Sequence, residues 1–125
     1  MKTPIILQKV SAGFPSPAAD FVQDEINLNN ELIKNPPATF LIRVEGNSMI
    51  EHKITSGDML VVDRSLSLTN DCIAVINFNN ELVVKNIIKE KNSFYINTKE
   101  GKILINENSD INLWGIVTYI IHATN

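Results

Sequence analysis

The amino-acid sequence predicts a mostly β fold: a compact, curled antiparallel sheet or partly open barrel, with one or two short helices near the N-terminus. Short runs rich in Val and Ile recur from residue 39 to the end of the chain, and Asn, Gly, Asp and Lys separate them. Runs of this length and spacing are typical of antiparallel strands joined by tight turns. The 125 residues, of which 44% are hydrophobic, suffice for one domain with one core.

Seven strands are expected. The first, TFLIRVE, alternates apolar and polar residues, whereas the second and third, MLVVD and CIAVINF, are short apolar runs. A turn at Asn79-Asn80 precedes the fourth, ELVVKNIIK. The expected strands span residues 39–45, 59–63, 72–78, 81–89, 93–97, 103–106 and 111–123.

Ahead of the strands the pattern is helical. Ser16 can cap a helix whose first turn contains Pro17, and apolar residues then recur at helical spacing. A short helix is therefore expected over residues 17–27. A second turn or a separate short helix is expected around residues 28–33, and it must end before Pro36 and the proline that follows it.

Residues 1–14 are expected to form an extended N-terminal arm ahead of a β domain of residues 15–125. The stretch AGFPSPAAD (12–20) contains two prolines, which lack a backbone donor and favour extended conformations in the residues before them. The arm is narrowest at Ala12-Gly13, where neither side chain is larger than a methyl group. It is therefore suited to lie in a cleft.

Composition and charge exclude several classes of function. The net charge is −3 and the 11 basic residues are scattered, so direct binding of nucleic acid over a broad surface is not expected. Cys72 is the only cysteine, which rules out an intrachain disulfide and a thiolate metal cluster. Two isolated histidines do not supply metal ligands at the usual spacing. No metal and no cofactor are expected.

Neither a secretion signal nor a membrane span is expected. The apolar patch near the N-terminus, residues 4–7, is shorter than the apolar core of a signal peptide. No run approaches the roughly 18 apolar residues of a transmembrane helix. We therefore expect a cytoplasmic protein.

The segment EGNSMIEHKITSGDMLVVD (45–63) carries the first candidate for catalysis. Gly46 permits a turn that a Cβ would obstruct, and Asn47 tolerates left-handed backbone geometry. Ser48 is then expected at the tip of the turn with its hydroxyl accessible. By itself, this pattern also fits an ordinary serine-containing turn.

Lys85, in the strand ELVVKNIIK, is the second candidate. Side chains alternate along a strand, so Lys85 is expected on the same face as Val83 and Ile87, which are apolar and β-branched. A lysine acts as a base only in its neutral form, which an apolar environment favours. By itself, Lys85 also fits an edge-strand lysine that reaches into solvent.

Taken together, these segments resemble the LexA/UmuD family of self-cleaving Ser-Lys proteases (peptidase S24), and its UmuD-like members most closely. AGFPSPAAD (12–20) is similar to the family's cleavage segment, GNSM (46–49) to its nucleophile turn, ITSGDMLVVD (54–63) to the strand that follows, and ELVVKNI (81–87) to its lysine strand. Ser48 lies 35 positions after Gly13, and Lys85 lies 37 positions after Ser48, as in the family. The resemblance runs from about residue 10 to the C-terminus.

The resemblance implies a mechanism. Ser48 would attack the carbonyl carbon of Ala12, and Lys85 would take the serine proton and pass it to the amine of Gly13. Backbone N–H groups of the turn Asn47–Met49 would stabilise the oxyanion. The protein would thus be a serine endopeptidase that cleaves its own arm.

The resemblance also implies partners. UmuD-like proteins are homodimers whose self-cleavage in the SOS response is stimulated by RecA–single-stranded-DNA filaments. The shortened dimer then serves as an accessory subunit of a UmuC-like Y-family polymerase in error-prone translesion synthesis. LexA-type repressors carry a helix-turn-helix ahead of the cleavage site, and no such domain is expected here. The run LWGIVTYII (113–121) is a candidate dimer strand, although a core strand explains it equally well.

Three other functions remain open. A Ser/His/Asp hydrolase would use His52 or His122, but His52 is only four residues from Ser48 and His122 is near the end of a terminal strand. Asp58 and Asp63 are better interpreted as turn and strand-end residues. A non-enzymatic dimerisation or binding module derived from such a protease would act by contact alone. A signal-peptidase-like enzyme would use the same dyad on other proteins, normally from a membrane anchor.

Overall fold

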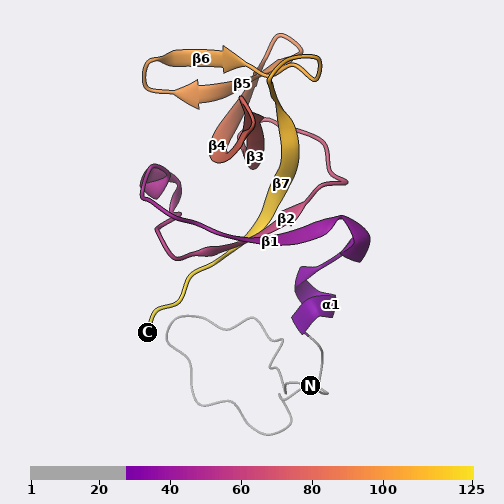
Figure 1. The fold of residues 1–125 in the computed structure, drawn as a ribbon, viewed down its shortest axis with the longest axis vertical. Helices are drawn as coiled ribbons and strands as arrows, with labels where there is room; N and C mark the ends of the chain where they lie inside the picture. The colour runs from indigo at the N-terminus through magenta and orange to yellow at the C-terminus, as the bar shows by residue number, and fades with distance from the viewer. Residues whose placement is uncertain (1–27) are drawn as a thin grey trace, which may run out of the picture. The chain divides into compact units, whose positions relative to one another are not determined.

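The structure is a computed structural model in which residues 28–125 are described (Figure 1). The expected arm, its Ala12-Gly13 bond and the helix expected over residues 17–27 lie outside these residues. They stay predictions, as does a domain boundary after residue 14.

The described chain falls into two units, and the first of them ends at Lys34. Its described part carries the helix α1 (Leu28–Leu32), and the N–H of Ile33 donates to the carbonyl O of Asn29 at 2.8 Å. The short helix expected around residues 28–33 is therefore confirmed.

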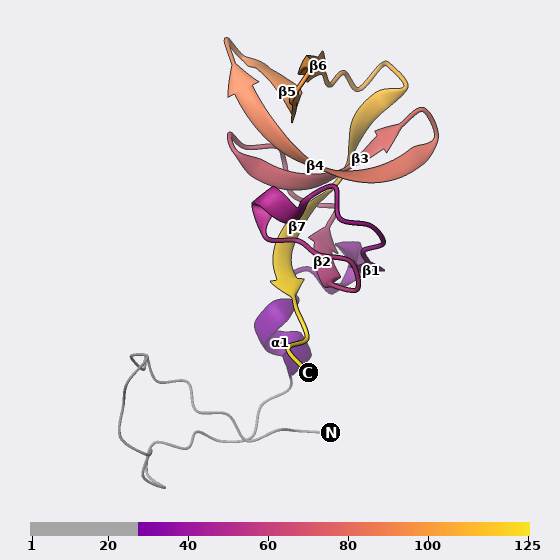
Figure 2. The same cartoon turned by 90° about the vertical axis from the view of Figure 1, so that its left-hand side faces the viewer.

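The second unit, Asn35–Asn125, begins with a short 3-10 helix, η2 (Pro36–Ala38), and continues as a seven-stranded sheet. All strand pairs are antiparallel, and their order is β1-β2-β7-β3-β4-β5-β6 (Figures 1 and 2). The strands are β1 (Thr39–Arg43), β2 (Met59–Asp63), β3 (Cys72–Phe78), β4 (Glu81–Glu90), β5 (Ser93–Thr98), β6 (Gly101–Leu104) and β7 (Ile111–Ile121).

The sheet confirms the predicted mostly β fold, and β2 and β3 have the predicted bounds. β4 and β5 each extend one residue further than predicted, and β1 and β7 each end two residues earlier. β6 lies two residues earlier than predicted, because Gly101 pairs with Thr98 across a tight turn. Its predicted last residue, Asn106, instead donates its N–H to the carbonyl O of Ile111 in the turn before β7.

β7 joins the two halves of the sheet. Its residues 111–116 pair with β3, and its residues 116–121 pair with β2. The pairing shifts register between Val61 and Val62 of β2 and between Val75 and Ile76 of β3, and such irregularities increase the local twist of a sheet. The sheet therefore curls about β7 without closing into a barrel, and β1 and β6 remain at its two edges (Figure 2).

Two clusters of buried apolar side chains form the core. Val84 and Val83 are neighbours on β4, and they pack against the first and the second cluster respectively, because successive side chains point to opposite faces of the strand. The buried members of the first cluster are Met49, Ile54, Leu60, Val62 and Val75. Those of the second cluster are Ala74, Ile76, Ile87, Ile96 and Ile116.

Gly115 is a point of close contact between β7 and β2. The residue is buried, and it pairs with Val75 of β3. A Cβ at this position would lie 2.6 Å from Cγ1 of Val62, a side chain that is itself fully buried. The lack of a side chain at Gly115 therefore permits the close contact at the centre of the sheet.

We expect Gly115→Ala to lower the free energy of unfolding by about 1–3 kcal/mol, because the added methyl group must displace the stiff Val62 side chain. Urea denaturation followed by circular dichroism measures the change. The Gly115→Ala/Val62→Ala double variant is the matched control, because it removes the methyl group that clashes. Its loss of stability should be smaller than the sum of the two single losses; additive losses would show that the clash is not the cause.

Candidate active site

The predicted turn around Ser48 is present in the structure. Gly46 has a φ of 93°, a conformation that glycine adopts readily, and Ser48 is exposed two residues later. The next residue, Met49, is only 7% exposed and belongs to the first core cluster. The serine is thus held at the surface by a neighbour that is anchored in the core.

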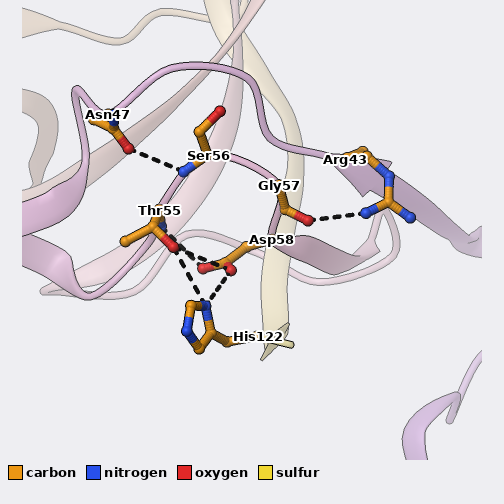
Figure 3. Close-up of polar contacts among 7 residues, drawn as sticks. All are labelled: Arg43, Asn47, Thr55, Ser56, Gly57, Asp58 and His122. Carbon is orange, nitrogen blue, oxygen red and sulfur yellow. Dashed lines mark hydrogen bonds and ion pairs between the residues drawn. The ribbon is translucent and has the colours of Figure 1, made fainter. Parts of the chain in front are cut away.

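A second segment, Thr55–Asp58, supports this turn. The N–H of Ser56 donates to Oδ1 of Asn47 at 3.0 Å (Figure 3), and the N–H of Gly46 donates to Oγ of Ser56 at 3.1 Å. These reciprocal hydrogen bonds fix the backbone immediately before Ser48. Asn47 therefore shapes the turn through its side chain as well as through its backbone.

Lys85 is half-buried on β4, opposite Ala74 of β3. It shares a face of the strand with Val83 and Ile87, as predicted, and both of these pack against the second cluster. Ile87 is fully buried in this cluster. In the lining of a cavity that includes Lys85, Leu82 and Val83 are apolar neighbours from the same strand.

Ser48 and Lys85 line the same two cavities. The first has a volume of about 380 Å³ and lies between β1, the serine turn and β4. The second has a volume of about 360 Å³ and lies between the serine turn, η3 (Ile50–His52) and the end of β5. The first is lined by Ile42, Arg43, Val44, Glu45, Gly46, Ser48, Met49, Leu82, Val83, Val84 and Lys85. The second is lined by Asn47, Ser48, Met49, Ile50, Glu51, His52, Lys85, Asn97, Thr98 and Lys99.

Within the described residues, the backbone donors of the serine turn and the amine of Lys85 have few polar contacts. Within residues 28–125, none of the ion pairs involves Lys85. In the same part of the chain, no acceptor is paired with the N–H of Ser48 or of Met49, the two donors closest to the serine hydroxyl along the backbone. The predicted cleavage residues, Ala12 and Gly13, lie outside the described residues.

The two histidines have different surroundings. His52 lines the second cavity with Ser48, whereas His122 is absent from both linings. Nδ1 of His122 instead lies 2.6 Å from Oδ1 of Asp58, a buried carboxylate that is 2% exposed (Figure 3). Asp58 also accepts from the N–H of Thr55 at 2.9 Å, which agrees with its interpretation as a turn residue. The sequence analysis did not predict the pairing of Asp58 with His122. The Thr55-x-x-Asp58 spacing is a local signal for the turn alone.

Hydrogen bonds hold the pKa of Asp58 below its usual range. The N–H of Thr55 is the largest cause, and the hydrogen bond from His122 is the next, while burial acts in the opposite direction. Asp58 is therefore a carboxylate at neutral pH.

The pKa of Asp63, at the end of β2, is lowered in the same way. Nδ2 of Asn35 donates to Oδ2 at 2.8 Å, and this bond is the largest cause. Oγ of Ser65 donates to Oδ1 at 2.5 Å. These contacts agree with the interpretation of Asp63 as a strand-end residue.

We expect Asp58→Asn to make the protein less stable at neutral pH and less sensitive to acid. A carboxyl group whose pKa is lowered in the folded state stabilises the fold above its ordinary pKa of 3.8, and this contribution is lost as the pH falls through the folded-state value. Wild type should therefore lose more stability than the variant between about pH 5 and pH 2.

Thermal unfolding across this pH range measures the difference in acid sensitivity. Asp110→Asn changes an exposed aspartate immediately before β7 and is the matched control. If Asp58→Asn and wild type lost stability in parallel on acidification, the hydrogen-bonded carboxylate would not be the source of the effect.

Among residues 28–125, no helix is long and apolar enough to cross a membrane. In the same range, no group of three or more His, Cys, Asp and Glu side chains is placed to bind a metal ion. Cys72 is half-buried and packs against the second cluster.

The curled, open antiparallel sheet is of the class found in LexA/UmuD-like proteins. A family model described as Peptidase S24-like matches residues 4–118 of the chain. The chain therefore belongs to the peptidase S24 family, a family of serine peptidases, and the resemblance seen in its motifs is confirmed.

Relatives of this chain agree with the assignment. Protein MucA of Salmonella typhimurium is 36% identical in an alignment that covers 93% of this chain and 82% of MucA. Protein ImpA of Shigella flexneri is 35% identical over 124 residues, which cover 97% of this chain and 84% of ImpA. The LexA repressor of Bacillus mycoides (strain KBAB4) is 32% identical over 99 residues, which cover 78% of this chain and 48% of the repressor.

Proposed function

We propose that the protein is a self-cleaving serine peptidase in which Ser48 is the nucleophile, Lys85 is the general base and the Ala12-Gly13 bond is the substrate. One observation carries the proposal: Ser48 and Lys85, from distant segments, line the same two cavities in a chain of the peptidase S24 family. Ser48 is exposed and Lys85 is half-buried, which supports roles as nucleophile and base if the two groups meet in these cavities.

The chemistry has two stages. Oγ of Ser48 attacks the carbonyl carbon of Ala12 while Lys85 accepts the serine proton. The tetrahedral intermediate then collapses, its C–N bond breaks, and Lys85 gives the proton to the nitrogen of Gly13. Water hydrolyses the resulting ester between Ser48 and Ala12, again with Lys85 as base. The N–H groups of Ser48 and Met49 are suited to stabilise the oxyanion, because neither is paired with an acceptor within residues 28–125.

The two cavities favour a neutral lysine when a peptide occupies them. Lys85 is half-buried already, and Leu82, Val83 and Val84 beside it are apolar. A segment lying over the two cavities would exclude water from the amine, and desolvation disfavours the charged form of a lysine. Binding of the arm and activation of the base are therefore coupled in this mechanism.

We expect Ser48→Ala and Lys85→Ala each to reduce cleavage by a factor on the order of 10³ or more, because the mechanism needs both groups. The full-length chain is incubated at alkaline pH, which favours the neutral amine, and mass spectrometry follows the appearance of a chain that begins at Gly13. Circular dichroism reports whether each variant is folded.

Two variants are matched controls for this experiment. Lys89→Ala removes an exposed lysine from the same strand, and Ser67→Ala removes an exposed serine from the loop after β2. Both should cleave at the wild-type rate. If Ser48→Ala were still cut between Ala12 and Gly13, the mechanism would be wrong. If wild type were never cut, the chain would instead be a non-enzymatic dimerisation or binding module.

We further propose that the processed protein is a homodimer that acts as an accessory subunit of a UmuC-like Y-family polymerase in the SOS response, with RecA–single-stranded-DNA filaments as the activator of cleavage. The resemblance to UmuD-like proteins supports this role. The C-terminal half of β7 also supports a dimer contact: within the described residues it pairs only with β2, and Tyr119, Ile120 and Ile121 are 38–40% exposed. The proposed setting is the cytoplasm.

A further inference from the structure

His122 contacts the segment that supports the serine turn. The residue follows the end of β7, and its Nδ1 lies 2.6 Å from Oδ1 of Asp58 and 3.3 Å from Oγ1 of Thr55 (Figure 3). Within residues 28–125, Asp58 and Thr55 are the side chains that form hydrogen-bond contacts with the ring. Because Asp58 is a carboxylate, Nδ1 of His122 carries the proton of this hydrogen bond.

The contacts of His122 continue to the nucleophile turn through a short series of hydrogen bonds. Asp58 accepts from the N–H of Thr55 at 2.9 Å and from its hydroxyl at 3.2 Å, so the carboxylate holds the start of this segment. The next residue, Ser56, exchanges two hydrogen bonds with Gly46 and Asn47. Asn47 immediately precedes Ser48.

We propose that His122 is a positioning residue for the nucleophile turn: by donating Nδ1–H to the buried Asp58, it fixes the segment of Thr55 and Ser56 against Gly46 and Asn47. His122 lies outside both cavities, so it acts through these residues and not on the substrate. The effect on cleavage rests on the proposed function, whereas the effect on the turn does not.

The different burial of His122 and Asp58 distinguishes a positioning role of His122 from a contribution to core packing. The side chain of His122 is 56% exposed and that of Asp58 is 2% exposed. Truncating the ring therefore leaves no cavity in the core, but it takes a donor from a buried carboxylate, which is costly for the local structure. The consequence should be confined to the segments that Asp58 holds.

Two substitutions of His122 test the loss of its hydrogen-bond donor separately from the change in side-chain size. In His122→Asn, Nδ2 of the amide stands at the same number of bonds from Cβ as Nδ1 of the imidazole and can donate to Asp58. In His122→Leu, a methyl group takes that place and no donor remains. The two variants are otherwise similar in size.

The first measurement is amide hydrogen exchange by NMR, in full-length chains that also carry Ser48→Ala so that they stay intact. With His122→Leu, the amides of Gly46 and Ser56 should exchange about tenfold faster, because the hydrogen bonds that protect them open more often. Amides of β3 and β4 should exchange as before. With His122→Asn, all of these rates should stay within about twofold of the parent.

The second measurement is the first-order rate of cleavage in chains that keep Ser48. His122→Leu should slow cleavage about tenfold, and His122→Asn should largely restore the rate. If wild type is not cleaved, the proposed function fails, and the exchange measurement alone decides the role of His122. The proposal is overturned if His122→Leu leaves the exchange rates of the Gly46 and Ser56 amides unchanged, or if both variants raise these rates equally. It is also overturned if exchange rates rise across the whole sheet.

Discussion

The close contact between β7 and β2 at Gly115 is the constraint on which the rest of the structure depends. One strand pairs with β3 through its first half and with β2 through its second half, and the two halves of the sheet meet where β7 has no side chain. The fully buried Val62 fills the space that a Cβ would need. This contact lies between the β1–β2 half, which is adjacent to the serine turn, and the β3–β4 half, which carries the lysine.

The first core cluster connects this packing to the two cavities that Ser48 and Lys85 line. Met49, next to Ser48 in sequence, belongs to the cluster, and Val84, next to Lys85, packs against it. The two candidate catalytic groups are thus immediate neighbours of residues that share one core. Interior packing, which tolerates little change in volume, therefore holds both backbone segments in place. The serine also depends on local hydrogen bonds, because the Asn47–Ser56 contact fixes the backbone that leads to it.

The sequence predicts the parts of this arrangement that are local. Runs of β-branched residues locate the strands, since such side chains fit a pleated, half-buried surface. The Gly46-Asn47-Ser48 turn follows from the backbone freedom of Gly46, which has a positive φ, whereas Asn47 contributes through its side-chain hydrogen bond. Strand ends are less predictable, as β6 shows, because hydrogen bonds in the adjacent turns decide them. The pairing of Asp58 with His122 joins residues 64 positions apart, so it follows from the register of β2 against β7 and no local pattern reveals it.

The proposed mechanism requires a sheet that stays open. An extended peptide must reach Lys85 in this mechanism. Lys85 is half-buried, and the lining of the first cavity includes the apolar Leu82, Val83 and Val84 together with the charged Arg43 and Glu45. In this mechanism, the bound peptide supplies the missing cover and excludes water from the amine. In the proposed mechanism, cleavage therefore depends on whether the chain's own arm occupies the two cavities.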